Sequence, residues 1–93
     1  MHGLVVRLQI DTARAEDAVK LLHEFVVPTV KQGAGFVSGT WMRSEDGTGT
    51  CSVLLYEDEE VAKAAAGRAA EGPPSGAPTT FVSAEVFEVM AQA

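Results

Sequence analysis

The side chains in this sequence that could do chemistry are few and widely spaced. Arg7 lies in the middle of one apolar run, Tyr56 ends another, and His23 is the only histidine inside a predicted element. An arginine can stabilise an anionic intermediate such as an enolate or phenolate. A tyrosine hydroxyl can orient an aromatic substrate, and a histidine that reaches the site can act as a general base. We therefore take Arg7, Tyr56 and His23 as candidate catalytic residues.

Each of these side chains also has a structural interpretation. Arg7 could form a salt bridge across a subunit interface with Glu85, Glu88 or another acidic residue of the partner. Tyr56 could pack within that interface. His23 lies toward the polar side of its predicted helix. The residues alone leave these alternatives open. His2, so close to the terminus, is expected to be frayed.

Three further side chains could line a substrate site. Gln9 would contribute a polar group, Trp41 a flat stacking surface and Leu54 an apolar wall, although Trp41 could equally pack in a core. Cys51 is the only cysteine. It cannot form an internal disulfide, and its apolar surroundings predict a small buried hydrophobic residue.

Metal, cofactor and polyanion binding are not expected. The two histidines share no metal-ligand spacing, and the acidic run from Glu57 to Glu60 lacks the pattern of a calcium loop. A net charge of −6 and a pI near 4.7 argue against nucleic acid and anionic membranes as partners. No apolar run approaches the roughly 18 residues that cross a bilayer. A cytoplasmic location is therefore expected.

The chain is predicted to be one domain, residues 1–93, built from six elements. Apolar residues alternate in the strands and recur at helical spacing in the helices, with Pro28 expected to kink or break the first helix. The expected elements are strands over Gly3–Asp11, Phe36–Arg43, Thr50–Tyr56 and Phe81–Met90, a helix from Ala15 to about Gly33, and a helix between Asp58 and Gly72. This order predicts an α+β, ferredoxin-like βαββαβ fold, with a four-stranded antiparallel sheet and two helices on one face.

Such a fold leaves the other face of the sheet uncovered. We predict that the helices cover Leu4, Val6, Leu8, Ile10, Cys51, Val53 and Leu55. The uncovered face would then carry Val5, Arg7, Gln9, Leu54 and Tyr56, with either Val86 or Phe87 from the last strand. An apolar patch of this kind usually marks an interface. The simplest completion is a homodimer, whose paired sheets could enclose a cavity for a small aromatic ligand.

Two segments resemble a known family. Gly35-Phe36 opens the second strand after the run from Pro28, and Leu55-Tyr56-Glu57-Asp58-Glu59-Glu60-Val61-Ala62 leads from the third strand into the second helix. Both are similar to the antibiotic biosynthesis monooxygenase-like family of dimeric α+β barrels, and by element order the resemblance covers essentially the whole chain.

The resemblance implies a small homodimer. Some members oxidise flat aromatic or quinone-like molecules without a metal or flavin, relatives degrade heme, and others have no known activity. It also implies that Tyr56 faces the cavity. The chain departs from the family in two ways, because it contains no asparagine and has no histidine in its second predicted helix.

Two functions remain open from the sequence. The first is a cofactor-independent monooxygenase that binds, desolvates and deprotonates a small aromatic or polyketide-like molecule, with Arg7 and Tyr56 polarising it. The second is a non-catalytic dimer that binds a small ligand or provides an assembly surface. The scarcity of ionisable groups on the presumed inner face favours the second, and the resemblance favours the first.

Overall fold

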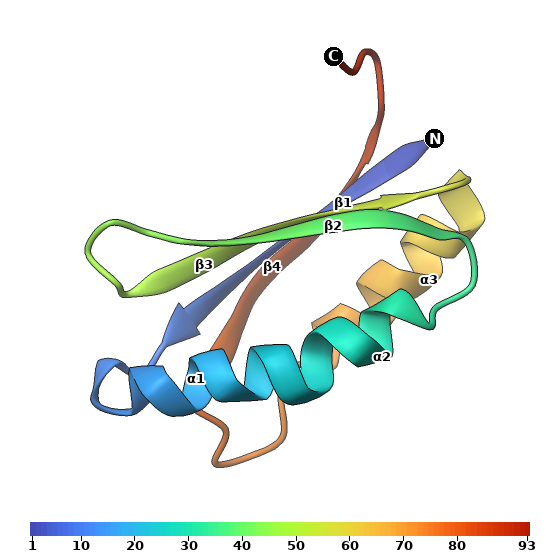
Figure 1. Ribbon diagram of the computed structural model, residues 1–93. Coiled ribbons are helices and arrows are strands. Elements are labelled where there is room, and N and C mark those ends of the chain that lie inside the picture. Colours follow the sequence, from blue (N-terminus) through green and yellow to red (C-terminus); the bar gives the residue numbers. More distant parts are fainter.

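The computed structural model describes residues 1–93 as one layer of helices on one sheet (Figure 1). The strands are β1 (His2–Ile10), β2 (Phe36–Arg43), β3 (Gly49–Tyr56) and β4 (Thr79–Glu88). The helical elements are η1 (Thr12–Arg14), α1 (Ala15–Leu21), η2 (Leu22–Val26), α2 (Val27–Lys31) and α3 (Glu59–Ala70). No helix is both long enough and apolar enough to cross a membrane.

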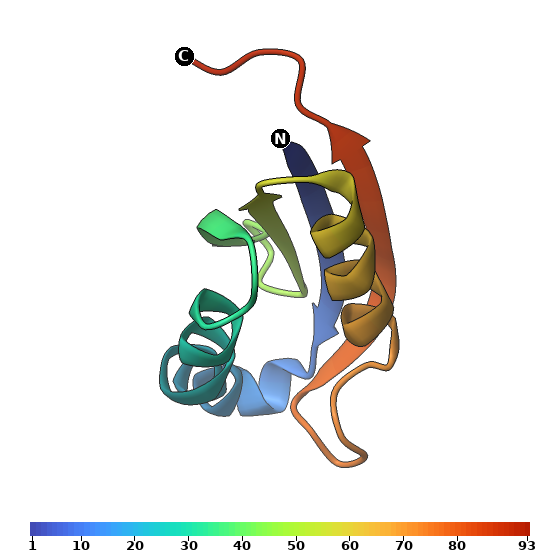
Figure 2. The same cartoon turned by 90° about the vertical axis from the view of Figure 1, so that its right-hand side faces the viewer.

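The sheet has the order β2-β3-β1-β4, and every neighbouring pair is antiparallel. Both helical stretches lie next to each other on the same face of the sheet, where α1 and α2 cover one half and α3 covers the other half (Figure 2). The predicted ferredoxin-like fold is confirmed. The ends of the strands differ by one or two residues from the prediction, and β4 begins at Thr79, two residues early.

The first helix is interrupted, as Pro28 predicts, but the interruption begins earlier than expected. Its backbone widens into a π-helical turn at Leu22–Val26 and returns to α geometry from Val27. Proline has no N–H, and its ring crowds the carbonyl four residues before it, at Glu24. A wider turn ahead of Pro28 relieves that crowding, so the helix continues to Lys31.

Side-chain caps fix where the helices begin. Asp58 Oδ1 accepts a hydrogen bond from the Val61 amide at 3.0 Å, and Asp11 Oδ1 accepts one from the Ala13 amide at 3.1 Å. Each cap satisfies an amide that has no partner within its helix. Arg14 then ties this end of the fold to the loop before β4 by donating to the carbonyls of Gly76 and Ala77.

The predicted faces are right for β1 and wrong for β3. Leu4, Val6 and Ile10 are buried beneath the helices as expected. Leu4 pairs with Leu54, however, and residues directly opposite in an antiparallel ladder point to the same face. Ser52, Leu54 and Tyr56 therefore lie under the helices, whereas Cys51, Val53 and Leu55 lie on the uncovered face. The core cluster comprises Leu4, Val6, Leu54, Tyr56, Ala62 and Ala65.

The uncovered face is nonetheless strongly apolar. Phe87 pairs with Gly3 and is 49 % exposed, whereas Val86 pairs with Leu4 and faces the helices. Cys51 is only half-buried there, so its predicted burial is wrong for the chain by itself. Besides Phe87, the large apolar side chains exposed on β2 and β4 are Val37, Met42 and Val82.

The prediction that His2 is frayed is wrong. It is the first residue of β1, pairs with Tyr56 on one side and Glu88 on the other, and has a side chain only 17 % exposed. Its Nε2 lies 3.3 Å from Glu59 Oε2 at the start of α3. The ladder on both sides and this contact hold the terminus in place.

A candidate ligand cavity between the sheet and the helices

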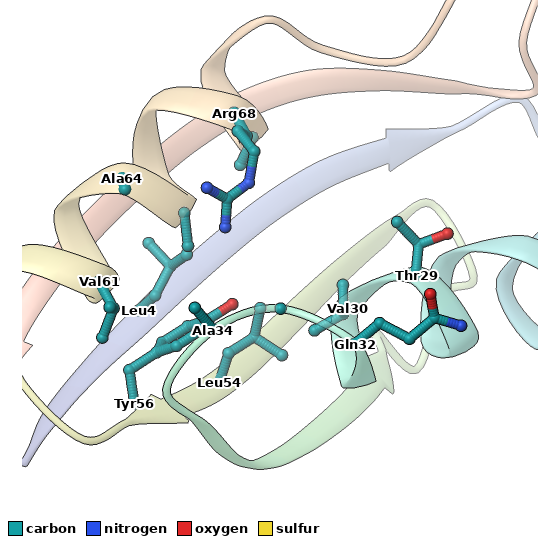
Figure 3. A pocket seen from close by; sticks show the side chains of 13 residues that line it. Leu4, Thr29, Val30, Gln32, Ala34, Leu54, Tyr56, Val61, Ala64 and Arg68 are labelled. Atoms are coloured by element: carbon teal, nitrogen blue, oxygen red, sulfur yellow. The ribbon is translucent and has the colours of Figure 1, made fainter.

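A cavity of about 450 Å³ lies between the sheet and helices α2 and α3. Its floor is formed by Leu4, Leu54 and Tyr56, and α2 supplies Val30 to one wall (Figure 3). The wall from α3 is made largely of small side chains, namely Val61, Ala64, Ala65 and Ala69. Because alanines do not fill the space above the sheet, the cavity follows from the composition of α3. Its volume falls in the range of small-molecule sites.

Tyr56 is the central polar side chain of the floor. The residue is 2 % exposed, and its ring meets the ring of Phe36 edge-on, with centroids 5.9 Å apart and planes at 77°. No group of the chain is hydrogen-bonded to its hydroxyl, which points into the cavity (Figure 3). Burial raises the pKa of Tyr56 above 10.0, and the positive charge of Arg68 opposes that rise only in part. At neutral pH the hydroxyl therefore carries its proton and can donate it in a hydrogen bond.

The remaining polar lining residues lie at the rim. Arg68 reaches from α3 over the cavity. On the other side, Thr29 comes from α2 and Gln32 directly follows it (Figure 3). Arg68 and Tyr56 are the only titratable lining residues. No three His, Cys, Asp or Glu side chains gather anywhere in the chain in a way that could hold a metal ion.

The predicted catalytic residues do not come together within the chain. Tyr56 lines the cavity, but Arg7 lies exposed on the opposite face of the sheet, where it pairs with Cys51 and Ser83. His23 is exposed in the π-helical turn and does not line the cavity. The expectation that Arg7 and Tyr56 share a face is wrong, because the register of β3 against β1 places them on opposite faces.

The predicted binding residues divide in the same way. Leu54 is part of the floor, whereas Gln9 is exposed on the face that carries Arg7. Trp41 pairs with Ser52 and so faces the helices, and it packs against the core without lining the cavity. Its ring lies above Gly39, where an added Cβ would be 2.7 Å from the Trp41 ring and 2.9 Å from Leu54.

This cavity lies in another layer than the one predicted from the sequence, and three of its polar residues were missed. The predicted cavity between the sheets of two subunits stays a prediction, whereas the cavity found here lies beneath the helices of a single chain. Arg68 could have been found, because Val61, Ala64, Ala65, Arg68 and Ala69 recur at positions that share one face of a helix. Thr29 and Gln32 follow the interruption at Pro28, where helical periodicity gives no clear direction.

The element order and the sheet topology define an α+β protein of the ferredoxin-like class. Solved structures that share this fold include the following two. The heme-degrader MhuD from Mycobacterium tuberculosis, with two hemes bound in its active site, superimposes with a TM-score of 0.76 at 18% identity. That match covers 100% of this chain and 99% of MhuD.

The second structure is a monooxygenase from the gene ActVA-Orf6 of Streptomyces coelicolor, in complex with nanaomycin D. It matches with a TM-score of 0.65 at 23% identity, over 99% of this chain and 89% of that one. These neighbours confirm the predicted resemblance at the level of the fold. No protein-family model matches the sequence, and no curated protein matches it.

Proposed function

We propose that this protein binds a flat, mainly apolar aromatic or polyketide-like molecule in the cavity beneath its helices and oxidises it as a cofactor-independent monooxygenase. The observation that carries this proposal is a cavity of about 450 Å³, mainly apolar, whose floor presents the unpartnered hydroxyl of the buried residue Tyr56. The two fold neighbours, a heme-degrader and a monooxygenase in complex with nanaomycin D, support the same class of function.

Tyr56 is proposed to stabilise the anion formed from the substrate. A ring ketone with an acidic CH₂ group loses a proton to give an enolate, and the neutral phenol can donate a hydrogen bond to the enolate oxygen. Because the pKa of Tyr56 is raised, the phenol is not itself the base at neutral pH. The proton passes to solvent at the open rim. The carbanion then reduces O₂, one oxygen atom enters the ring as a carbonyl, and the other leaves as water.

The same proposal includes a homodimer formed through the uncovered face of the sheet. Phe87, Val82 and Met42 are each about half exposed there, beside the half-buried Val53 and Leu55. Contiguous apolar surface of this kind is usually covered by a partner. Arg7 makes no ion pair within the chain, so a partner's carboxylate could pair with it across the interface.

An anthrone supplies a direct test, because its CH₂ group is acidic and its oxidation to an anthraquinone consumes one O₂. We expect the protein to accelerate O₂ uptake and anthraquinone formation in the presence of a chelator and without added flavin. Ala64→Phe would narrow the cavity from its exposed wall and is expected to lower the rate at least about tenfold. Ala70→Phe, on the same helix but outside the lining, is the matched control. Equal rates with and without protein would contradict the monooxygenase.

One observation favours a second function, a non-catalytic ligand-binding dimer. No His, Asp or Glu lines the cavity, so no side chain there is an obvious general base. Trp41 is the only tryptophan and packs beside Leu54, so its fluorescence can report ligand binding. Quenching by anthraquinone in wild-type protein, without any acceleration of anthrone oxidation, would support this second function.

A further inference from the structure

The only charged side chain on the cavity wall is Arg68. It lies in the last turns of α3, one helical turn after Ala64 and Ala65, and its guanidinium extends over the cavity opposite Tyr56 (Figure 3). The side chain is exposed and stands at the rim. A bound molecule would therefore meet Arg68 with its outer edge and Tyr56 with its buried edge.

The guanidinium of Arg68 has no partner in the chain. The three ion pairs involve other residues, and none of the side-chain hydrogen bonds comes from Arg68. Arg14 makes a clear contrast, because its guanidinium bonds to Asp11 and to two backbone carbonyls. With 13 acidic residues against 7 basic ones, this chain has many carboxylates that could have paired with Arg68.

The opposite rim carries no charge to balance Arg68. Thr29 and Gln32 are neutral, and the rest of the lining is apolar apart from Tyr56 and Gly33. The guanidinium also influences the floor, because its charge lowers the pKa of Tyr56 against the larger effect of burial. The lining thus carries one positive side chain on the α3 side and neutral hydrogen-bonding groups on the α2 side.

We infer that Arg68 is a specificity-determining residue that binds a carboxylate on the ligand, so that the protein selects flat apolar molecules carrying an acidic group at one edge. A guanidinium matches a carboxylate with two parallel N–H donors. This inference rests on the proposed function, because it concerns a ligand in the same cavity. A position near the end of α3 also lets Arg68 interact with the helix dipole, which would affect stability but not ligand choice.

The test compares two probes of the same shape, 2-naphthoate and 2-naphthylmethanol, by titration calorimetry on the full chain. We expect Arg68→Gln to lower the ratio of naphthoate to naphthylmethanol affinity roughly 5- to 20-fold, with the alcohol affinity unchanged. Lys63→Gln removes the same charge from α3 outside the lining and is expected to leave the ratio as in wild type. High salt should lower the ratio in wild type but not in Arg68→Gln.

The outcomes separate this inference from the proposed function. If both probes bind wild type but Arg68→Gln leaves the ratio unchanged, selection by Arg68 is wrong and the cavity still stands as a ligand site. A variant that only melts at a lower temperature, with an unchanged ratio, likewise overturns selection by Arg68 and assigns the residue to the helix dipole. The proposed cavity fails, and the inference fails with it, if neither probe binds wild type. The same conclusion follows if Ala64→Phe binds both probes as tightly as wild type does.

Discussion

Replacing Gly35 by alanine should destabilise this fold through a clash that can be separated from the cost of its backbone conformation. Gly35 immediately precedes β2 and has a φ of +71°, in the left-handed region that disfavours side chains. A Cβ there would lie 2.7 Å from Cγ2 of Val61 in α3. The Gly35 carbonyl also accepts a hydrogen bond of 2.8 Å from the Glu57 amide, so the backbone has little freedom to move away.

The magnitude has two parts. Placing alanine at positive φ costs about 1–2 kcal/mol. Forcing a methyl group against a packed side chain adds roughly 1–3 kcal/mol. Gly47 in the β2–β3 turn isolates the first part, because its φ is +77° and nothing lies within 4 Å of an added Cβ. We therefore expect Gly35→Ala to cost roughly 2–5 kcal/mol and Gly47→Ala only about 1–2 kcal/mol.

Equilibrium unfolding in urea measures the free energy of unfolding of each variant. Adding Val61→Ala to Gly35→Ala should restore part of the lost free energy of unfolding, because it removes the two Val61 atoms closest to the new methyl group. Equal losses for Gly35→Ala and Gly47→Ala would refute the steric part of this reasoning. The steric part would also be refuted if the losses in free energy of unfolding from Gly35→Ala and Val61→Ala simply add in the double mutant. A clash should also weaken ligand binding, since Val61 lines the cavity.

Three further predictions concern the site and the uncovered face. Tyr56→Phe should change the free energy of unfolding by less than about 1 kcal/mol, because the hydroxyl has no hydrogen-bond partner within the chain. The same variant should slow anthrone oxidation about tenfold or more. An unchanged rate would remove Tyr56 from the mechanism. Tyr56 is the only tyrosine, so tyrosinate absorbance on alkaline titration reports it alone, and its raised pKa should give a midpoint above 10.0. The folded state holds the Tyr56 proton more tightly than the unfolded state. The contribution of the protonated phenol to stability is therefore complete below the unfolded pKa and is lost as pH rises through the folded pKa. A titration midpoint at or below the ordinary value of 10.0 would contradict the burial argument. Val53→Glu should give a monomer in sedimentation at micromolar concentration with the helical circular dichroism retained, while Met90→Glu, at a site 91 % exposed, should not; a wild-type monomer would rule out the dimer.

Much of the fold could be predicted because local signals agree with one another. The acidic cap Asp58, the interruption at Pro28 and the glycine-rich segments set where the elements begin and end. In β1 the residue types themselves distinguish the two faces, because aliphatic side chains alternate with Arg7 and Gln9. The element order and the faces of β1 follow from such signals within a few residues of each position.

The faces of β3 could not be predicted in this way. One alternating set contains Cys51, Val53 and Leu55, and the other contains Ser52, Leu54 and Tyr56. Both sets are mostly apolar, and a shift of one residue exchanges them completely. Hydrophobicity alone favours the purely apolar set for the core. The pairing of Leu4 with Leu54 reverses that choice, and it moves Tyr56 from the uncovered face to the cavity floor.

The sequence by itself therefore determined the order of strands and helices and the presence of one uncovered sheet face, because these depend on residues close together in the chain. Only the tertiary structure decided where the cavity lies and that Tyr56 and Arg68 share it. Their meeting depends on the register between β1 and β3 and on the packing of α3 over both strands. Those relations join residues far apart in sequence, and no local pattern encodes them.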